Sequence, residues 1–137
     1  MIIEILRKHE GVESHAYVDS VGKITLGVGR NIDPNQGLGL SDDEIDYLLA
    51  NDVVRVEAEL SQVFRWYDDL NDARKDAMMD MCFNMGLPRL MLFKRALAAM
   101  SARLYEIAAV EFLDSRWAKQ VGHRAITISE MIRTGEY

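Results

Sequence analysis

Two carboxylates and one hydroxyl near the N-terminus have the types and spacing needed for acid–base chemistry on a glycosidic bond. Glu10 stands where an apolar run that stops at Gly11 predicts the end of a short helix. Asp19 and Thr25 lie on either side of a predicted turn. A hairpin would place residues 19 and 25 nearly opposite each other. If the helix packs against this hairpin, the three side chains converge on one cleft.

Cleavage of a glycosidic bond needs one carboxyl that stays protonated and a second group that stays ionised. Glu10 would face the negative end of the helix dipole, which disfavours its ionised form, whereas Asp19 in an open turn should stay charged. We therefore assign Glu10 as the general acid and Asp19 as base or electrostatic stabiliser. Spacing alone favours a simpler interpretation, in which Glu10 forms a salt bridge at a helix end and Asp19 stabilises a turn.

The elements that must position these residues form an α+β chain. Residues 15–29 contain two β-rich runs around a glycine-containing turn, which predicts a hairpin, and residues 31–39 have the glycines and proline of a loop. A capping-box sequence at residues 41–44 begins a helix that should run to about Leu60. Further helices are predicted at residues 71–85, 90–100, 104–113 and 123–134.

The predicted architecture is a small N-terminal lobe with a β-hairpin, joined by a long helix to a mainly helical C-terminal lobe. A chain of 137 residues has the length of one domain. We expect the small lobe at roughly 12–40 and the connecting helix at roughly 41–60. The helical lobe should cover roughly 61–137 together with the N-terminal helix.

Composition excludes several classes of function. The formal net charge of −6 argues against sequence-independent nucleic-acid binding and confines attraction of an anionic substrate to a local patch. No run approaches 18 consecutive apolar residues, so we expect no membrane span, and the N-terminal residues lack the pattern of a secretory signal. The single cysteine, Cys82, lies on an apolar helix and should be a buried, inert thiol.

The residues around the candidate acids resemble a known catalytic signature. His9-Glu10-Gly11, Tyr17-Val18-Asp19 and the run 22–29 (Gly-Lys-Ile-Thr-Leu-Gly-Val-Gly) follow the pattern E-G…Y-x-D…G-x-x-T-[IL]-G-x-G of phage-type lysozymes, glycoside hydrolase family twenty-four. That family includes the endolysins of T-even phages. Four later segments, in the same order, also resemble parts of those enzymes: residues 51–53, 83–86, 115–117 and 133–135.

This resemblance implies a muramidase that hydrolyses the β-1,4 bond between N-acetylmuramic acid and N-acetylglucosamine in peptidoglycan, inverting the anomeric centre. It implies that Glu10 is the catalytic acid, Asp19 the second carboxylate and Thr25 the hydroxyl that helps to place the attacking water. Positions on the substrate-binding walls correspond to Phe83, Asn84 and Glu111. It implies no metal and no cofactor.

The chain also departs from the T-even pattern. Arg30 stands where those enzymes carry a histidine that pairs with an aspartate, and we predict that Arg30 pairs with Asp52 instead, without titrating near neutral pH. The loop at 31–40 is shorter, which predicts a trimmed small lobe with less of a third strand and a more open cleft. The chain is acidic, whereas the T-even enzymes are strongly basic.

Two other functions remain open at this point. A peptidoglycan-binding or interaction module with little turnover would fit the acidic charge and the trimmed lobe, although it would not need all three signature residues. A lytic transglycosylase would need one acid/base and no water, so the presence of Asp19 and Thr25 favours hydrolysis. Trp66 and Trp117 could stack on sugar rings, but core packing is the favoured interpretation for both.

The partner implied is bacterial cell-wall peptidoglycan, acted on by a monomer. We expect the enzyme to gather in the host cytoplasm and to reach the periplasmic cell wall through a holin pore. A phage endolysin, a prophage remnant and a tail-associated lysin would have similar sequences. His9, Glu13 and His15 match no strong metal-binding spacing.

Overall fold

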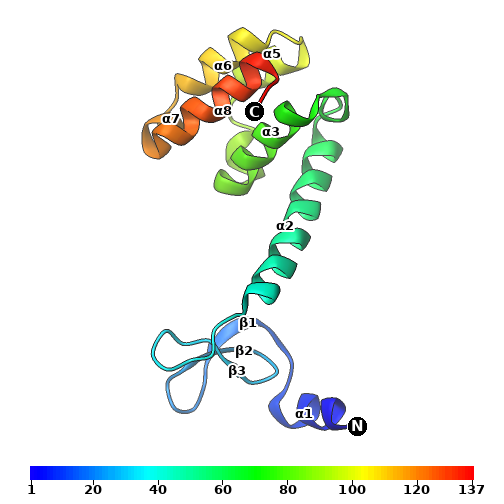
Figure 1. Ribbon diagram of the computed structural model, residues 1–137, viewed down its shortest axis with the longest axis vertical. Coiled ribbons are helices and arrows are strands. Elements are labelled where there is room, and N and C mark those ends of the chain that lie inside the picture. The colour runs from blue at the N-terminus through cyan, green and yellow to red at the C-terminus, as the bar shows by residue number, and fades with distance from the viewer. The chain divides into compact units, whose positions relative to one another are not determined.

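The computed structural model describes all 137 residues, which form two compact units, residues 1–49 and residues 50–137. The chain has eight α-helices, one 3-10 helix and three strands, with the strands near the N-terminus (Figure 1). The predicted α+β, lysozyme-like fold class is confirmed. None of the helices combines the length and the apolar character needed to cross a membrane.

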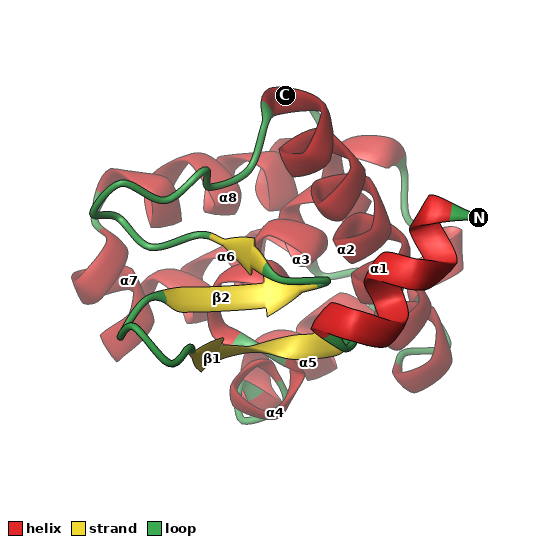
Figure 2. Cartoon of the chain, turned by 90° about the horizontal axis from the view of Figure 1, so that it is seen from below, coloured by secondary structure: helices red, strands yellow, loops and turns green.

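The first unit contains a three-stranded antiparallel sheet in the order β1-β2-β3, drawn in yellow in Figure 2. Its elements are α1 (Ile2–Glu10), β1 (Glu13–Val18), β2 (Ile24–Gly27) and β3 (Arg30–Asn31). Thr25 lies opposite Tyr17 on β1 and opposite Asn31 on β3. With two residues, β3 is as short as the trimmed loop predicts.

The β1–β2 turn has a defined geometry that fixes the position of Asp19. The Gly22 N–H donates to the Asp19 carbonyl (3.1 Å), and the Asp19 N–H donates to the Lys23 carbonyl (2.9 Å). Gly22 has a φ of 83°, the left-handed conformation that closes a three-residue hairpin loop after a type I turn. Asp19 therefore lies opposite Lys23. Thr25 is the diagonal neighbour of Asp19, whereas the sequence predicted that these two residues lie nearly opposite each other.

Helix α2 (Asp42–Val63) begins at the predicted capping box. The Ser41 N–H donates to Glu44 Oε1 at 3.0 Å, which satisfies one of the backbone donors at the helix start. The helix continues three residues past the predicted end at Leu60 and runs through the boundary between the two units.

The second unit is helical throughout, and most of its helix boundaries agree with the prediction. After α2 come η1 (Tyr67–Asp69), α3 (Asp72–Met85), α4 (Leu87–Leu90), α5 (Lys94–Ser101), α6 (Tyr105–Leu113), α7 (Arg116–Val121) and α8 (His123–Thr134). The single helix predicted at 90–100 is instead α4 and α5, because α4 begins earlier, with Pro88 in its first turn. The sequence prediction lacked α7, which Ser115 caps by accepting from the Ala118 N–H (3.1 Å).

The apolar core of the second unit combines methionine and aromatic side chains with alanines and branched aliphatic residues. Met78, Met81 and Phe112 are fully buried. Trp117 is also buried and packs edge-on against Phe93, with ring centres 6.4 Å apart, so it is a core residue. Cys82 is buried as well, and this burial raises the pKa of its thiol.

Arg74 on α3 holds the last turn of α8. Its Nε donates to the Ile132 carbonyl (2.7 Å) and its Nη2 to the Arg133 carbonyl (3.2 Å), while the guanidinium lies 3.7 Å from the centre of the Tyr105 ring. We expect Arg74→Met to lower the free energy of unfolding by about 1–3 kcal/mol, because it leaves two helix-end carbonyls without their donor. Urea denaturation would measure this.

The matched control for that substitution is Arg133→Met. Arg133 forms an exposed ion pair with Glu130 on the same helix (2.8 Å), and such pairs contribute about 0–1 kcal/mol. A loss for Arg74→Met no larger than that for Arg133→Met would contradict the assigned role of Arg74.

Candidate functional site

Glu10 is the last residue of α1, and its carboxylate lies against the β2–β3 turn. A Cβ atom placed on Gly29 would be 2.7 Å from Glu10 Oε2 and 3.0 Å from its Cδ. Gly29 has a φ of 68° and follows β2 by two residues. The structure therefore brings the Glu10 carboxylate onto the β2–β3 turn, where only a residue without a side chain leaves room for it.

Asp19 presents one free carboxylate oxygen at the end of the hairpin. Its Oδ1 accepts two backbone hydrogen bonds, from the Val21 N–H (3.0 Å) and the Lys23 N–H (2.8 Å). Its Oδ2 has no partner in the protein. The two backbone bonds fix the orientation of the carboxylate, and Oδ2 is left to accept a hydrogen bond from water or ligand.

Thr25 is the only buried residue of the first unit. Its Oγ1 donates to the Lys23 carbonyl at 3.0 Å, so the hydroxyl has a fixed direction and keeps its lone pairs for a second partner. Diagonal neighbours in a hairpin, such as Asp19 and Thr25, are about 7–8 Å apart, with their Cβ atoms somewhat closer. That separation leaves space for a water molecule between a carboxylate and a hydroxyl.

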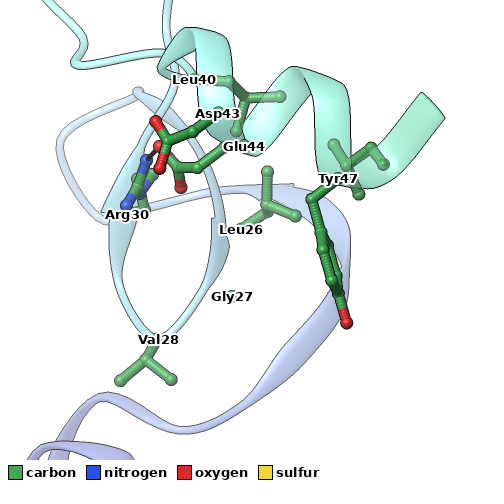
Figure 3. A pocket seen from close by; sticks show the side chains of 9 residues that line it. Leu26, Gly27, Val28, Arg30, Leu40, Asp43, Glu44 and Tyr47 are labelled. Atoms are coloured by element: carbon green, nitrogen blue, oxygen red, sulfur yellow. Dashed lines mark hydrogen bonds and ion pairs between the residues drawn. The ribbon is translucent and has the colours of Figure 1, made fainter. Parts of the chain in front are cut away.

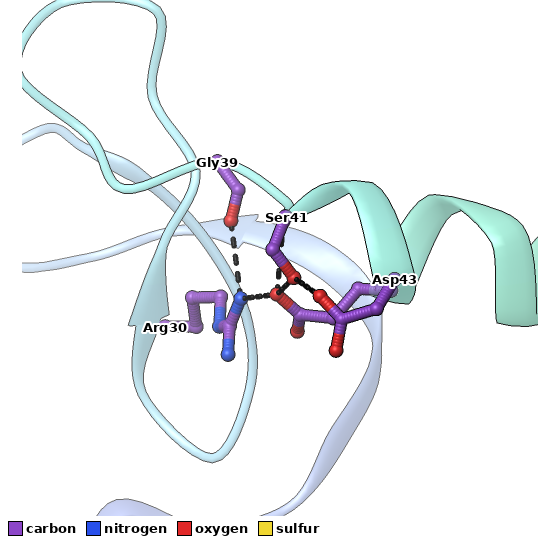
Figure 4. Close-up of polar contacts among 5 residues, drawn as sticks. Arg30, Gly39, Ser41 and Asp43 are labelled. Atoms are coloured by element: carbon purple, nitrogen blue, oxygen red, sulfur yellow. Dashed lines mark hydrogen bonds and ion pairs between the residues drawn. The ribbon is translucent and has the colours of Figure 1, made fainter.

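Arg30 forms its ion pair within the first unit, which corrects the prediction of an Arg30–Asp52 bridge. Its Nη1 donates to Glu44 Oε1 and to the Gly39 carbonyl (3.2 Å), as Figure 4 shows. Asp52 pairs instead with Arg55, three residues along α2 (2.9 Å). The reason is local: the short loop after β3 brings the start of α2, with Glu44 in its first turn, to the guanidinium.

The hydrogen bonds of Glu44 make the stability of the protein dependent on acid pH. The Ser41 backbone N–H, then the Ser41 hydroxyl and the Arg30 guanidinium, lower the pKa of Glu44 to about 2. Because this value lies below that of a free glutamate, the stabilisation is present above about pH 4.5 and is lost as the pH falls towards 2. We expect Glu44→Gln to flatten this part of the profile of urea midpoint against pH. An unchanged slope would contradict the assignment.

A hollow of about 620 Å³ lies between the sheet and the first turns of α2, and it contains none of the three candidate catalytic residues. Figure 3 shows apolar side chains around most of it, with the ion-paired Arg30 and Glu44 at one side. The apolar lining includes Leu26, Leu40 and Tyr47. The two carboxylates of the hollow, Asp43 and Glu44, both accept from the Ser41 hydroxyl, and Glu44 also pairs with Arg30, so they stabilise the start of α2.

Phe83, Asn84 and Glu111, the residues predicted to bind substrate, belong to the second unit. Phe83 is 49% exposed and borders a hollow at the end of α3. Asn84 Oδ1 accepts from the indole N–H of Trp117 (2.9 Å), which leaves the Asn84 amide nitrogen without a partner in the protein. Glu111, on α6, lines a different hollow, beside Lys94 and Arg95. The structure thus places Phe83 and Glu111 at separate hollows.

The sequence did not predict the Asn84–Trp117 hydrogen bond. The sequence did contain a signal for this bond. Core packing was expected for Trp117, which is buried, and a buried indole N–H needs an acceptor. This bond fixes the amide of Asn84, since the indole can only donate. No cluster of three or more His, Cys, Asp or Glu side chains is close enough to hold a metal ion.

This chain is similar to known lysozyme-family sequences over nearly its whole length. The family model described as "Phage lysozyme" matches residues 7–131. "Probable T4-type lysozyme 2" of Dictyostelium discoideum is 24% identical over 161 residues, covering 96% of this chain and 93% of that protein. "Probable T4-type lysozyme 1" of the same organism is 24% identical over 160 residues, covering 98% and 94%. "Pre-baseplate central spike protein Gp5" of Enterobacteria phage T4 is 28% identical over 158 residues, covering 96% of this chain but 27% of that protein.

Proposed function

Because the chain belongs to the phage lysozyme family, and so is a glycoside hydrolase of the lysozyme type acting on peptidoglycan, we propose that it is an N-acetylmuramidase. It would hydrolyse the β-1,4 bond between N-acetylmuramic acid and N-acetylglucosamine. The observation that carries this proposal is the position of the Glu10 carboxylate, in contact with the β2–β3 turn. This turn follows the strand that carries Thr25, and Asp19 lies in the turn that precedes the same strand.

In the proposed mechanism, Glu10 donates a proton to the oxygen of the leaving sugar. The free Oδ2 of Asp19 accepts a hydrogen bond from a water molecule, whose position the Thr25 hydroxyl helps to fix. That water attacks the opposite face of the sugar ring and gives its proton to Asp19. Inversion at the anomeric carbon follows, because the water attacks directly and no covalent sugar–enzyme intermediate forms.

Three side chains of the second unit are proposed to bind the substrate. The exposed ring of Phe83 offers an apolar surface to a sugar face. The free amide nitrogen of Asn84 can donate to a sugar hydroxyl or acetamido oxygen, and the Glu111 carboxylate can accept from a hydroxyl or an amide.

The products of digestion test this proposal directly. Purified peptidoglycan should yield fragments with new reducing ends on N-acetylmuramic acid, with masses that include one added water. Fragments one water lighter, with an anhydro end, would identify a lytic transglycosylase. Binding to peptidoglycan without any release of reducing ends would identify a binding module, and either result would overturn the proposed hydrolysis.

A further inference from the structure

A small depression on the second unit combines aromatic rings with positive charge. Its volume is about 230 Å³, and it is lined by Arg65, Trp66, Asp69, Ser101, Arg103 and Tyr105. Pockets for drug-sized ligands measure about 300–1,000 Å³, so this one has the size for a single sugar ring and its substituents. Of the residues named above as catalytic or substrate-binding, none lines it.

Both aromatic rings of the depression are held from behind. Trp66 stacks on Phe64 with ring centres 4.9 Å apart, and the Arg74 guanidinium covers one face of Tyr105 at 3.7 Å. Both rings stay partly exposed on the side of the depression. A ring whose one face is fixed by packing can receive a ligand on its remaining surface with little loss of side-chain entropy.

The charge of the depression is opposite to that of the chain. Arg65 and Arg103 are exposed and form no ion pair, whereas the other charged group, Asp69, is a single carboxylate. In a chain with a net charge of −6, this is a local cationic site. Two guanidinium groups next to aromatic rings suit a ligand that has both a ring and a carboxylate.

Arg103 occupies a position where glycine would make the folded protein more stable. The Arg103 N–H donates to the Met100 carbonyl (3.1 Å) and the Leu104 N–H to the Ala99 carbonyl (2.8 Å), the bonds of a Schellman motif at the end of α5. Arg103 has a φ of 61°, the left-handed conformation that glycine adopts without strain. The side chain at this position therefore lowers stability, which is expected where a guanidinium serves binding.

We propose that this depression, the Trp66 site, is a second saccharide site that binds N-acetylmuramic acid whose lactyl carboxylate is free, as in glycan from which the stem peptides have been removed. The sugar ring of N-acetylmuramic acid stacks on Trp66 and Tyr105, and its lactyl carboxylate pairs with Arg103 and Arg65. The Asp69 carboxylate accepts hydrogen bonds from ring substituents, and the Ser101 hydroxyl can donate to them or accept from them. The proposal rests on peptidoglycan as substrate but not on the roles of Glu10, Asp19 and Thr25. It gives an acidic lysozyme a local means of holding anionic glycan that has lost its stem peptides.

The test is a titration of the full-length protein with free N-acetylmuramic acid, followed by the two indole N–H signals in ¹⁵N NMR. This sugar has no bond for the enzyme to cleave, so binding is measured apart from catalysis. The Trp66 signal should shift saturably, while the signal of the buried, hydrogen-bonded Trp117 stays in place. N-acetylglucosamine, which lacks the carboxylate, and lactate, which lacks the ring, should each bind about tenfold more weakly.

Arg103→Gly is the decisive variant, because binding and stability should change in opposite directions. It should weaken binding of N-acetylmuramic acid about tenfold and raise the melting temperature by about 2–4 °C. Arg89→Gln, an exposed substitution with the same change of charge outside the depression, should leave the titration unchanged. An unmoved Trp66 signal, equal binding of lactate, or unchanged binding by Arg103→Gly would each overturn the proposal.

Discussion

Replacing Glu10 with glutamine should slow peptidoglycan cleavage by about 10²–10⁴-fold, the usual contribution of a general acid. Glutamine has nearly the same shape as glutamate but cannot give a proton to the leaving sugar oxygen. Glu10 is exposed and makes no hydrogen bond or ion pair that the fold needs. The loss should therefore appear in the rate, with little change in the melting temperature. Clearing of chloroform-treated Gram-negative cells and release of reducing ends both measure it.

The matched control is Glu13→Gln. Glu13 is an exposed residue of β1, three positions after Glu10, so the substitution changes the same charge on the same unit. This variant should clear cells at the wild-type rate. If Glu10→Gln lysed cells as well as Glu13→Gln, the assignment of Glu10 as the acid would be wrong.

Helix ends were predictable from the sequence wherever a local signal marks them. The Ser41–Glu44 capping box, the Asn71 side chain that accepts from the Arg74 N–H, and Gly135 after α8 all have short-range causes. The division of residues 87–101 into α4 and α5 escaped prediction, because the apolar residues of both helices follow each other without an obvious break.

The sequence named the residues of the candidate site, but it did not predict their contacts. The residue types and order indicated Glu10, Asp19 and Thr25, whereas the pairing of Thr25 with Tyr17 depends on the loop length between the strands. The ion pair of Arg30 depends on the path of the loop after β3, and no sequence pattern specified Glu44 as its partner. Contacts between residues far apart in sequence are set by the tertiary structure, so local sequence patterns could not predict them.

The contact between Glu10 and Gly29 leads to the second large expected effect. Gly29→Ala should lower the cleavage rate about a hundredfold, because the new methyl group would lie 2.7 Å from the present position of Glu10 Oε2. The carboxylate is the end of a flexible side chain, so it can move aside and the fold should survive. The substitution should also lower the free energy of unfolding by about 1 kcal/mol, because alanine is strained at a φ of 68°.

Gly27→Ala separates backbone strain from displacement of the acid. Gly27 has a φ of 70°, almost the same as that of Gly29, but a Cβ placed on it would meet no atom within 4 Å. Both variants should therefore lose similar stability in urea denaturation, while only Gly29→Ala should lose most of its cleavage rate. Equal rates for the two variants would mean that the position of the Glu10 carboxylate against the β2–β3 turn does not matter for the reaction, and the proposed mechanism would then lack its geometric basis.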